Sequence, residues 1–213
     1  PTLGLARTGF LFGLSNALVA AWTIHRFKAQ LSNAAQQQRR AVLVIGFLLF
    51  GFVGSERLVQ WSEQQMFSDP IIHAQSTPYQ RLIVTRWQDD LRLYINGNLQ
   101  FSSRDEHRYH EALVHPALAT LPHAQRVLVL GGGDGLAIRE ILRYPQIQHV
   151  TLVDLDPAMT QLFSTNAELT ALNQHALTHP KVTVINEDAG KWLETHQGFY
   201  DVIIADFPDP SNF

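Results

Sequence analysis

The sequence predicts an α/β fold, in which an open parallel sheet follows a small antiparallel β unit and two apolar helices. Four short aliphatic runs alternate with helical stretches, and this alternation is typical of β–α–β units. The first run ends in a glycine-rich turn, GGGDG, and a helical stretch follows it. We therefore expect a Rossmann-like sheet, covered on both faces, that binds its ligand at the carboxyl ends of the strands. The four runs are residues 126–131, 149–154, 181–186 and 200–206.

Two apolar stretches, residues 9–24 and 41–54, begin the chain, and residues 25–40 between them carry four cations and no acid. A membrane span needs about 20 apolar residues, so each stretch is long enough only with its flanks. Neither stretch has the polar face of a soluble surface helix, so we interpret residues 1–60 as two transmembrane helices with a basic loop. Buried helices of a soluble domain are the alternative, and the second apolar stretch disfavours a signal peptide.

Residues 61–122 are expected to form a small antiparallel β unit followed by a helix. The Asn96-Gly97 pair lies between two alternating runs, which favours a hairpin with a type I′ turn. Within an antiparallel sheet over residues 71–103, the predicted strands are 79–87, 91–97 and 98–103.

The helix after the β unit is predicted within residues 102–118, because this stretch starts with Ser and Asp capping candidates. We expect Pro116 to interrupt it. The Rossmann-like domain then occupies residues 123–213. We expect its fold to continue beyond Phe213, because a parallel sheet that ended there would have an uncovered edge.

Composition excludes several classes of protein. The 213 residues carry a net charge of -3 and no cysteine. A nucleic-acid binder needs clustered Lys and Arg, which residues beyond 60 lack, and a chain without cysteine has no disulfide or Cys-ligated metal. His107, His110 and His115 suggest a metal site, but imidazoles at i and i+5 on a helix point about 140° apart. We therefore predict no metal site and no nucleic-acid partner.

Carboxylates follow all four predicted strands, and Lys191 is the only basic residue immediately beside them. Asp154 stands where a Rossmann dehydrogenase holds a ribose, but Asp134, inside the glycine loop, would repel a pyrophosphate. Each aspartate taken alone is better explained as a turn or cap residue. Together they suit a phosphate-free, cationic nucleoside such as a sulfonium nucleoside of the S-adenosylmethionine kind, with Asp154 on the ribose, Asp188 on the adenine amino group and Asp134 on a cationic group. The seven carboxylates are Asp134, Asp154, Asp156, Glu187, Asp188, Asp206 and Asp209.

An ordered set of motifs runs through residues 71–213. The motifs are YQ (79–80), LYINGNLQFSSRDEHRYHE (93–111), VLVLGGGDGLAIRE (127–140), LVDLDP (152–157), EDA (187–189) and DFPDP (206–210). In this order the motifs resemble those of the polyamine aminopropyltransferases, the spermidine synthase family. The apolar N-terminus is similar to the end of the membrane-spanning region found in some bacterial members.

The resemblance implies a reaction as well as a fold. The family's donor, decarboxylated S-adenosylmethionine, has lost its carboxylate and ends in an ammonium group, which Asp134 would bind. The aminopropyl group would pass to a di- or polyamine, putrescine by default, with release of methylthioadenosine. The donor is a co-substrate, and the resemblance implies no prosthetic group.

The resemblance also implies site residues. Asp206 matches the catalytic aspartate, which can accept the proton of the attacking amine, and Tyr109 matches a tyrosine near that amine. Asp209 would assist in binding the acceptor, while His110 and Gln80 match residues that bind the donor and its nucleoside. The positions that would bind the nucleoside are Gly131, Gly133, Gly135, Asp154, Asp188 and Ala189.

Two other functions stay open. Methyltransferases on this kind of sheet usually carry an acid two residues before the first glycine of the loop, where this chain has Val129. A non-catalytic, membrane-tethered sensor of polyamines or nucleosides is the other alternative. Common soluble synthases have Asp-Ser-Ser/Thr-Asp-Pro around the catalytic aspartate, whereas Pro208 stiffens that loop here, so the acceptor stays open.

Assembly and location are expectations of the same kind. Soluble members of the family form dimers or tetramers, which implies a homodimer or homotetramer. Because the donor is cytosolic, we expect the inner membrane with the catalytic domain on its cytoplasmic side. The positive-inside rule, applied to residues 25–40, gives the opposite side, so sidedness stays open. In the family, chain beyond Phe213 supplies further acceptor contacts, so residues 1–213 alone could bind without turnover.

Overall fold

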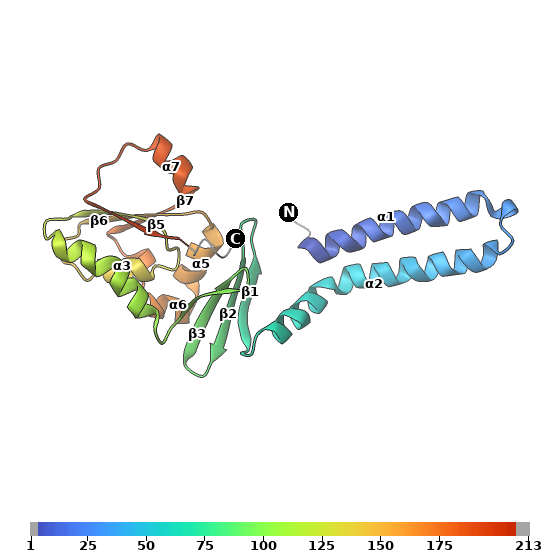
Figure 1. The fold of residues 1–213 in the computed structure, drawn as a ribbon, viewed down its shortest axis with the longest axis horizontal. Coiled ribbons are helices and arrows are strands. Elements are labelled where there is room, and N and C mark those ends of the chain that lie inside the picture. The colour runs from blue at the N-terminus through green and yellow to red at the C-terminus, as the bar shows by residue number, and fades with distance from the viewer. Residues whose placement is uncertain (1–3, 208–213) are drawn as a thin grey trace. The chain divides into compact units, whose positions relative to one another are not determined.

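A computed structural model describes residues 4–207, apart from the side chains of residues 4, 5, 56, 58, 60 and 63. The chain divides into two compact units, Pro1–Ser68 and Asp69–Phe213, and each is described by itself (Figure 1).

The first unit is an antiparallel pair of helices. Helix α1 covers Gly4–Arg26, a 3₁₀ turn covers Lys28–Gln30, and α2 covers Ala34–Met66. A Cβ added to Gly51 would lie only 2.2 Å from Cε1 of Phe10. The missing side chain of Gly51 therefore gives the Phe10 ring its place between the helices.

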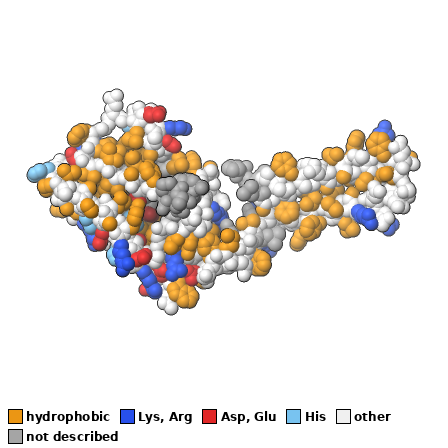
Figure 2. Space-filling model, viewed as in Figure 1, with side chains coloured by type: hydrophobic (Ala, Val, Ile, Leu, Met, Phe, Trp, Pro, Cys, Tyr) orange, Lys and Arg blue, Asp and Glu red, His pale blue; other side chains and the backbone are white. Residues whose placement is uncertain are grey.

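The surface of this helix pair is apolar. Among the described residues, one window, Ala34–Ser55 in α2, is long and apolar enough to cross a membrane, and only 11% of it is buried. A core helix of a soluble protein is mostly buried, whereas Phe47, Phe50 and Val53 are 70%, 77% and 78% exposed. Figure 2 shows hydrophobic side chains along the pair. Of the two expected transmembrane spans, the second, in α2, is among the described residues long and apolar enough to cross a membrane.

The second unit begins with the antiparallel sheet that residues 71–103 predict. Asn96 and Gly97 have φ values of 52° and 85°, so both adopt the left-handed conformation that a type I′ turn requires. The predicted hairpin is thus confirmed. The four strands, in the spatial order β1-β2-β3-β4, are β1 (Ile71–Ser76), β2 (Arg81–Trp87), β3 (Asp90–Ile95) and β4 (Asn98–Ser102).

Helix α3 follows over Glu106–Thr120 and runs through Pro116 without a break, so the predicted interruption is wrong. Proline removes one backbone N–H···O bond from a helix. Val114 and Leu118, on either side of it, are 0% and 1% exposed. Burial of this face offsets the lost bond.

The parallel sheet has the order β7-β6-β5-β8, and every neighbouring pair is parallel, which confirms the Rossmann-like prediction. The chain winds from β5 through β6 to β7 and then returns to the other side of β5 as β8. Such a reversal creates a crevice at the carboxyl ends of β5 and β8, the two strands between which the order reverses. The strands are β5 (Arg126–Gly131), β6 (His149–Asp154), β7 (Val182–Asn186) and β8 (Val202–Asp206).

The connecting helices are shorter than the sequence suggests. The predicted helical stretch after β6 breaks at Asn166, whose side chain accepts hydrogen bonds from the N–H groups of Glu168 and Leu169 and begins a new helix. A last helix, between β7 and β8, was not predicted. The elements are α4 (Leu136–Ile141), α5 (Pro157–Thr165), α6 (Ala167–Leu172), a 3₁₀ turn (Ala176–Thr178) and α7 (Ala189–Thr195).

The observed boundaries differ from the expected ones. Residue 60, the expected end of the first domain, lies inside α2, and the division falls after Ser68. Residues 61–122 and 123–213 were expected to be separate domains, but from Asp69 onward they form one unit. The reason is a shared core, because buried side chains of β2, β3 and β4 belong to the same hydrophobic cluster as those of β5 and α5.

The contact between Phe101 of β4 and Phe163 of α5 joins the two sheets, with ring centroids 6.0 Å apart in an edge-on arrangement. Phe163 is 0% exposed. We predict that Phe163→Ala lowers the free energy of unfolding by about 3–5 kcal/mol, through lost burial and the cavity left behind. The matched control is Phe199→Ala, because Phe199 is 73% exposed. Equal midpoints of chemical denaturation for the two variants would contradict the shared core.

Candidate active site

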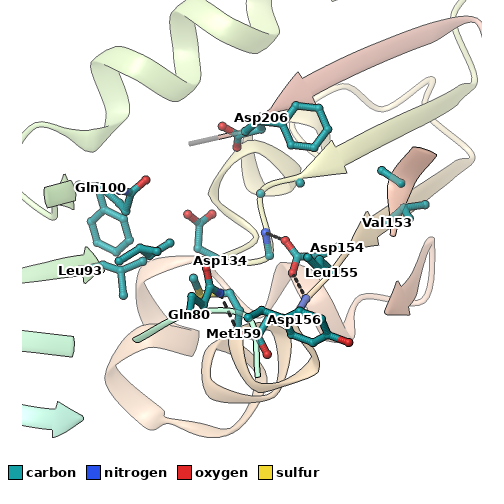
Figure 3. A pocket seen from close by; sticks show the side chains of 18 of the residues that line it. Gln80, Leu93, Gln100, Asp134, Val153, Asp154, Leu155, Asp156, Met159 and Asp206 are labelled. Carbon is teal, nitrogen blue, oxygen red and sulfur yellow. Dashed lines mark hydrogen bonds between the residues drawn. The ribbon is translucent and has the colours of Figure 1, made fainter. Parts of the chain in front are cut away.

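A cavity of about 720 Å³ opens at the carboxyl ends of the parallel strands and against the antiparallel sheet. Figure 3 shows Asp134, Asp154 and Asp206 around the glycine loop, with Leu93 and Gln100 contributed by the antiparallel sheet. Both halves of the second unit therefore build it. Its lining includes, of the predicted site residues, Gln80, Tyr109, His110, Gly131, Gly133, Asp134, Asp154, Asp188, Ala189 and Asp206.

The glycine loop approaches its neighbours more closely than any side chain would allow. Gly131 has φ +78°, and a Cβ there would lie 2.2 Å from the carbonyl oxygen of Asp206. A Cβ on Gly133 would lie 2.7 Å from Cγ of Asp154. Gly135, with φ +77°, precedes α4 and packs against Leu177 rather than lining the cavity. The loop glycines thus bring the two aspartates to the backbone.

Asp134 lies half-buried at the end of this loop. Its Oδ1 accepts a hydrogen bond of 2.9 Å from the N–H of Leu136, and Asn173 Nδ2 holds its carbonyl oxygen at 2.8 Å. Burial raises the pKa of Asp134, and the carboxylates of Asp154 and Glu106 add to the effect. A nearby cation would therefore be stabilised here.

Asp206 ends β8 beside the loop. Tyr109 donates a 2.9 Å hydrogen bond from its hydroxyl to Oδ1 of Asp206, whereas Oδ2 is buried without a partner among the described residues. Burial, followed by repulsion from Asp134, raises the pKa of Asp206 to about 6. Burial and the Asp206 charge also raise the pKa of Tyr109, so this phenol stays a donor. The free oxygen suits the acceptance of a proton from a ligand.

His110, on α3, completes this corner. One ring nitrogen of His110 and one oxygen each of Asp134 and Asp206 lie within 4.8 Å of one another. Burial opposes a charge on the imidazole, but a hydrogen bond to Glu106 and the carboxylates of Asp134 and Asp206 outweigh it and raise the pKa of His110. Three such side chains could hold a metal ion, yet a protonated imidazole equally neutralises the two acids.

The other histidines named as metal candidates do not join this group. His115 bonds the Tyr144 hydroxyl through Nδ1 at 3.0 Å and has its Nε2 3.3 Å from Glu140. Together with Glu111 and Glu140, His115 forms a second cluster of possible ligands, but Arg143 already lies 2.6 Å from Glu140 there. The guanidinium of Arg143 already balances the charge of Glu140, so this cluster does not need an added cation.

Asp154 receives two backbone hydrogen bonds, 3.0 Å from the N–H of Gly133 and 2.9 Å from that of Asp156. These bonds fix its carboxylate toward the cavity, and burial raises its pKa. Asp188 instead caps α7, since its Oδ1 accepts from the N–H of Lys191 at 2.9 Å. It lines the cavity together with Ala189.

Gln80 lies in the lining, but its side-chain amide donates a 2.9 Å hydrogen bond to Oδ2 of Asp156. Thr77 donates to the same oxygen at 2.8 Å, and Oδ1 of Asp156 caps α5 through the N–H of Ala158. Asp156 is 2% exposed. Its side chain thus joins the β1–β2 loop to the parallel sheet. The sequence predicted Asp156 at the binding edge but did not predict this structural role.

Asp209 and Pro208 lie outside the described residues. Sequence reasoning also missed the apolar wall of the cavity, which the antiparallel sheet, the end of β6, the β6–α5 loop and α5 supply. Its signal was present, because Leu93 and Ile95, like Leu99 and Phe101, alternate along predicted strands. The apolar lining residues are Leu93, Ile95, Leu99, Phe101, Val153, Leu155 and Met159.

The fold and the cavity together define a Rossmann-like protein with a carboxylate-lined crevice at the carboxyl ends of its parallel strands. The model of the spermine/spermidine synthase domain matches residues 106–213. The chain belongs to this family.

Curated relatives match along the whole chain. It is 64% identical over 217 residues to polyamine aminopropyltransferase 2 of Ralstonia nicotianae, covering 100% of this chain and 42% of the relative. It is 52% identical over 213 residues to the polyamine aminopropyltransferase of Leptospira interrogans, covering 100% of this chain and 43% of the relative. The chain thus spans about two fifths of the length of these relatives.

Solved structures agree in fold. The spermidine synthase of Thermotoga maritima superimposes with a TM-score of 0.61 and 23% identity, covering 66% of this chain and 47% of that one. A spermidine synthase in complex with the transition state analogue AdoDATO superimposes with a TM-score of 0.60 and 23% identity, covering 64% of this chain and 47% of that one. These likenesses support the Rossmann-like architecture.

The raised pKa of Asp206 has a consequence for stability. Folding favours its protonated form, so the stability that this group contributes is complete below its ordinary pKa of 3.8 and is lost as the pH rises through about 6. Asp206→Asn stays neutral and keeps an oxygen for Tyr109. We predict that at about pH 7 this variant unfolds with a free energy about 1–3 kcal/mol higher than the unliganded wild type, and that the difference shrinks toward about pH 4.

Chemical denaturation over this pH range measures the effect. The control is Asp201→Asn, because hydrogen bonds from the N–H groups of Gln125 and Arg126 lower the pKa of Asp201. That stability is present above the ordinary pKa of 3.8 and is lost as the pH falls, so the control should lose stability near neutral pH. A pH-independent difference for Asp206→Asn would contradict the raised pKa.

Proposed function

We propose that this chain is the donor-binding and catalytic part of an aminopropyltransferase. It would move the aminopropyl group of decarboxylated S-adenosylmethionine to a di- or polyamine, putrescine by default, and release methylthioadenosine. Polyamine aminopropyltransferase is the name of the relatives that match its whole length. The observation that carries the proposal is the pair of carboxylates, Asp134 and Asp206, with oxygens within 4.8 Å beside the glycine loop.

The charge of the cavity supports this donor. Asp154 suits the ribose hydroxyls, and Asp188 with Ala189 suits the adenine. The glycine loop then lies where the sulfonium side chain would run, and Asp134 there would pair with a terminal ammonium. Ordinary S-adenosylmethionine carries a carboxylate at this end of the molecule, which Asp134 would repel. The position where methyltransferases usually carry an acid, Val129, is 0% exposed inside β5 and cannot contact the donor's amino group.

The reaction would be an in-line displacement. The nitrogen of the acceptor amine attacks the aminopropyl carbon bonded to sulfur, a C–N bond forms, and the C–S electron pair leaves with neutral methylthioadenosine. A free alkylamine has a pKa of about 10.4, so it arrives protonated and must lose a proton. Oδ2 of Asp206 is buried without a partner in the described part of the chain and suits this proton. A pKa of about 6 makes Asp206 a stronger base than an ordinary aspartate.

Tyr109 supports Asp206 in this role. Its hydroxyl donates to Oδ1, which orients the carboxylate and leaves Oδ2 for the amine. The tyrosine is half-exposed at the cavity, where it can also contact the arriving acceptor. Asp209 remains the proposed second contact of the acceptor.

The first test is transfer by the whole protein in detergent, with diamines and either donor, followed by mass spectrometry. Methylthioadenosine and an amine heavier by one aminopropyl unit should form from the decarboxylated donor only. Asp206→Asn should lower transfer at least about 100-fold, the usual contribution of a general base, and leave donor binding intact. Glu187→Gln is the control, because Glu187 is exposed beside the edge and does not line the cavity.

Two other outcomes would reject the proposal. Methylated product from ordinary S-adenosylmethionine would identify a methyltransferase. Donor binding without product, unchanged in Asp206→Asn apart from affinity, would indicate a sensor.

We also propose that α2 anchors the protein in the inner membrane, with the catalytic unit in the cytoplasm, where the donor is made. The exposed apolar face of Ala34–Ser55 supports an anchor. Phe50→Lys should lower the carbonate-resistant membrane fraction of this chain, since a charge at mid-membrane costs about 2.5–3.5 kcal/mol. Phe199→Lys is the matched control, because Phe199 is similarly exposed at 73%, against 77% for Phe50, and lies in the other unit.

Sidedness has a separate readout. Protease added to inside-out vesicles should cleave the second unit if that unit is cytoplasmic. Protection there, with cleavage in right-side-out vesicles, would place it outside. Assembly as a homodimer or homotetramer is a further proposal, which the mass of the detergent-solubilised protein tests.

A further inference from the structure

A buried ionic group lies beside the cavity and has no part in the transfer described above. Glu106 of α3 is 6% exposed, Arg139 of α4 is 8% exposed, and Glu140 is 1% exposed. The Arg139 guanidinium bonds both carboxylate oxygens of Glu106, at 2.8 and 3.0 Å, and one oxygen of Glu140 at 2.8 Å. A two-point bond of this kind fixes the direction of a carboxylate as well as its place. Glu106 is therefore held in one orientation.

Glu106 in turn contacts His110, one helical turn along α3. Nδ1 of His110 lies 2.8 Å from Oε2 of Glu106 and 2.8 Å from its carbonyl oxygen. Both oxygens can only accept hydrogen bonds, so Nδ1 must carry a proton in every charge state of the ring. Nε2 is then the nitrogen that gains or loses the second proton.

Three carboxylates from different elements surround this imidazole. Glu106 is on its own helix, Asp134 comes from the β5–α4 loop, and Asp206 from the end of β8. Tyr109 is a further titratable neighbour, with its ring edge-on to the imidazole and the two ring centroids 5.1 Å apart. The described residues around the ring thus supply negative charge and no competing cation in direct contact. His110 is itself 3% exposed, so water contributes little.

We propose that Glu106, held by Arg139, is a positioning residue that fixes the Nδ1-protonated form of His110 and makes the imidazolium the resident cation between Asp134 and Asp206. When the substrate cations bind, the Nε2 proton leaves to water and the carboxylates pair with the substrates instead. The second statement rests on the proposed function, whereas the first concerns the unliganded protein alone.

The exchange follows from the geometry. An ammonium group placed on Asp134 or Asp206 enters the same 4.8 Å group of atoms as the ring nitrogen. An imidazolium there would repel it, so cation binding favours the neutral ring. Binding linked to the loss of one proton strengthens by up to about tenfold per pH unit below the pKa of the releasing group. Glu106 therefore sets the pH range in which the cationic donor binds well.

The test of positioning is nuclear magnetic resonance of the full chain in detergent, with ¹⁵N in the histidine rings and His110→Gln to assign the signal. The wild type should show an Nδ1-protonated ring at high pH and a protonation midpoint above that of a free histidine. Glu106→Gln keeps an acceptor for Nδ1 but removes the charge, so the midpoint should shift to lower pH. Glu111→Gln, the same change at a partly exposed site of the same helix, should leave it unchanged.

A ring protonated on Nε2 in the neutral wild type would overturn the proposal, and this needs no variant to fold. An equal shift in both Glu→Gln variants would also overturn it, since the effect would then be general. Arg139 keeps its bond to Glu140 in Glu106→Gln, so its guanidinium retains a partner.

The exchange is tested by calorimetry at pH 7 in buffers of different ionisation enthalpy, with decarboxylated S-adenosylmethionine and neutral methylthioadenosine as probes. The cationic probe should release protons and the neutral one none, and His110→Gln should remove part of that release. If the cationic probe binds with the same proton release in the wild type and in His110→Gln, the exchange is overturned. No binding of either probe would reject the proposed function and the exchange, while the resonance experiment still decides the role of Glu106.

Discussion

The site depends on the close approach of the glycine loop to the end of β8. Gly131 and Asp206 are partners in the parallel register of β5 and β8, and the space between them admits no Cβ. Only a glycine, at φ +78°, allows this contact. Because the loop turns here, Asp134 comes to lie beside Asp206 instead of pointing into solvent. The reversal of strand order between β5 and β8 forms the crevice, and the close approach at Gly131 brings the two carboxylates together in it.

This proximity has an electrostatic consequence. Two full negative charges within 4.8 Å repel by about 3–4 kcal/mol at an effective dielectric constant of about 20. Burial increases the repulsion, and the pKa of Asp206 is raised first by its burial and then by the charge of Asp134. In the unliganded protein the His110 imidazolium proposed above offsets this repulsion, and a bound ammonium group would take its place. A pair of carboxylates this close together therefore suits a positively charged group.

The sequence predicts those features of the site that depend on local pattern. The aliphatic runs and their terminal carboxylates place Asp134, Asp154 and Asp206 at one edge, since the carboxyl ends of parallel strands meet there. Asn96-Gly97 predicts its hairpin because both residues tolerate positive φ. In each case a short segment contains the whole physical reason.

Features that depend on contacts between distant segments could not be predicted in the same way. Gln80 and Asp156 are 76 residues apart, and Glu106 and Arg139 are 33 apart, so no spacing rule joins them. The local pattern predicted a break in the helix at Pro116, but α3 is continuous there. Burial of one face of the helix keeps it continuous, and that burial depends on distant segments.

The second wall of the cavity explains why the antiparallel sheet matters to a site whose charges lie on the parallel one. Asp156 stands two residues after Asp154, donates its N–H to that carboxylate, and accepts side-chain bonds from Thr77 and Gln80. The position of Asp154 is thus tied to the β1–β2 loop. Leu93 and Phe101 then cover the crevice with apolar surface, which lowers the local dielectric and strengthens every charge interaction within it. Since Phe101 also packs on Phe163 beneath the parallel sheet, the packing that stabilises the unit is the packing that closes the cavity.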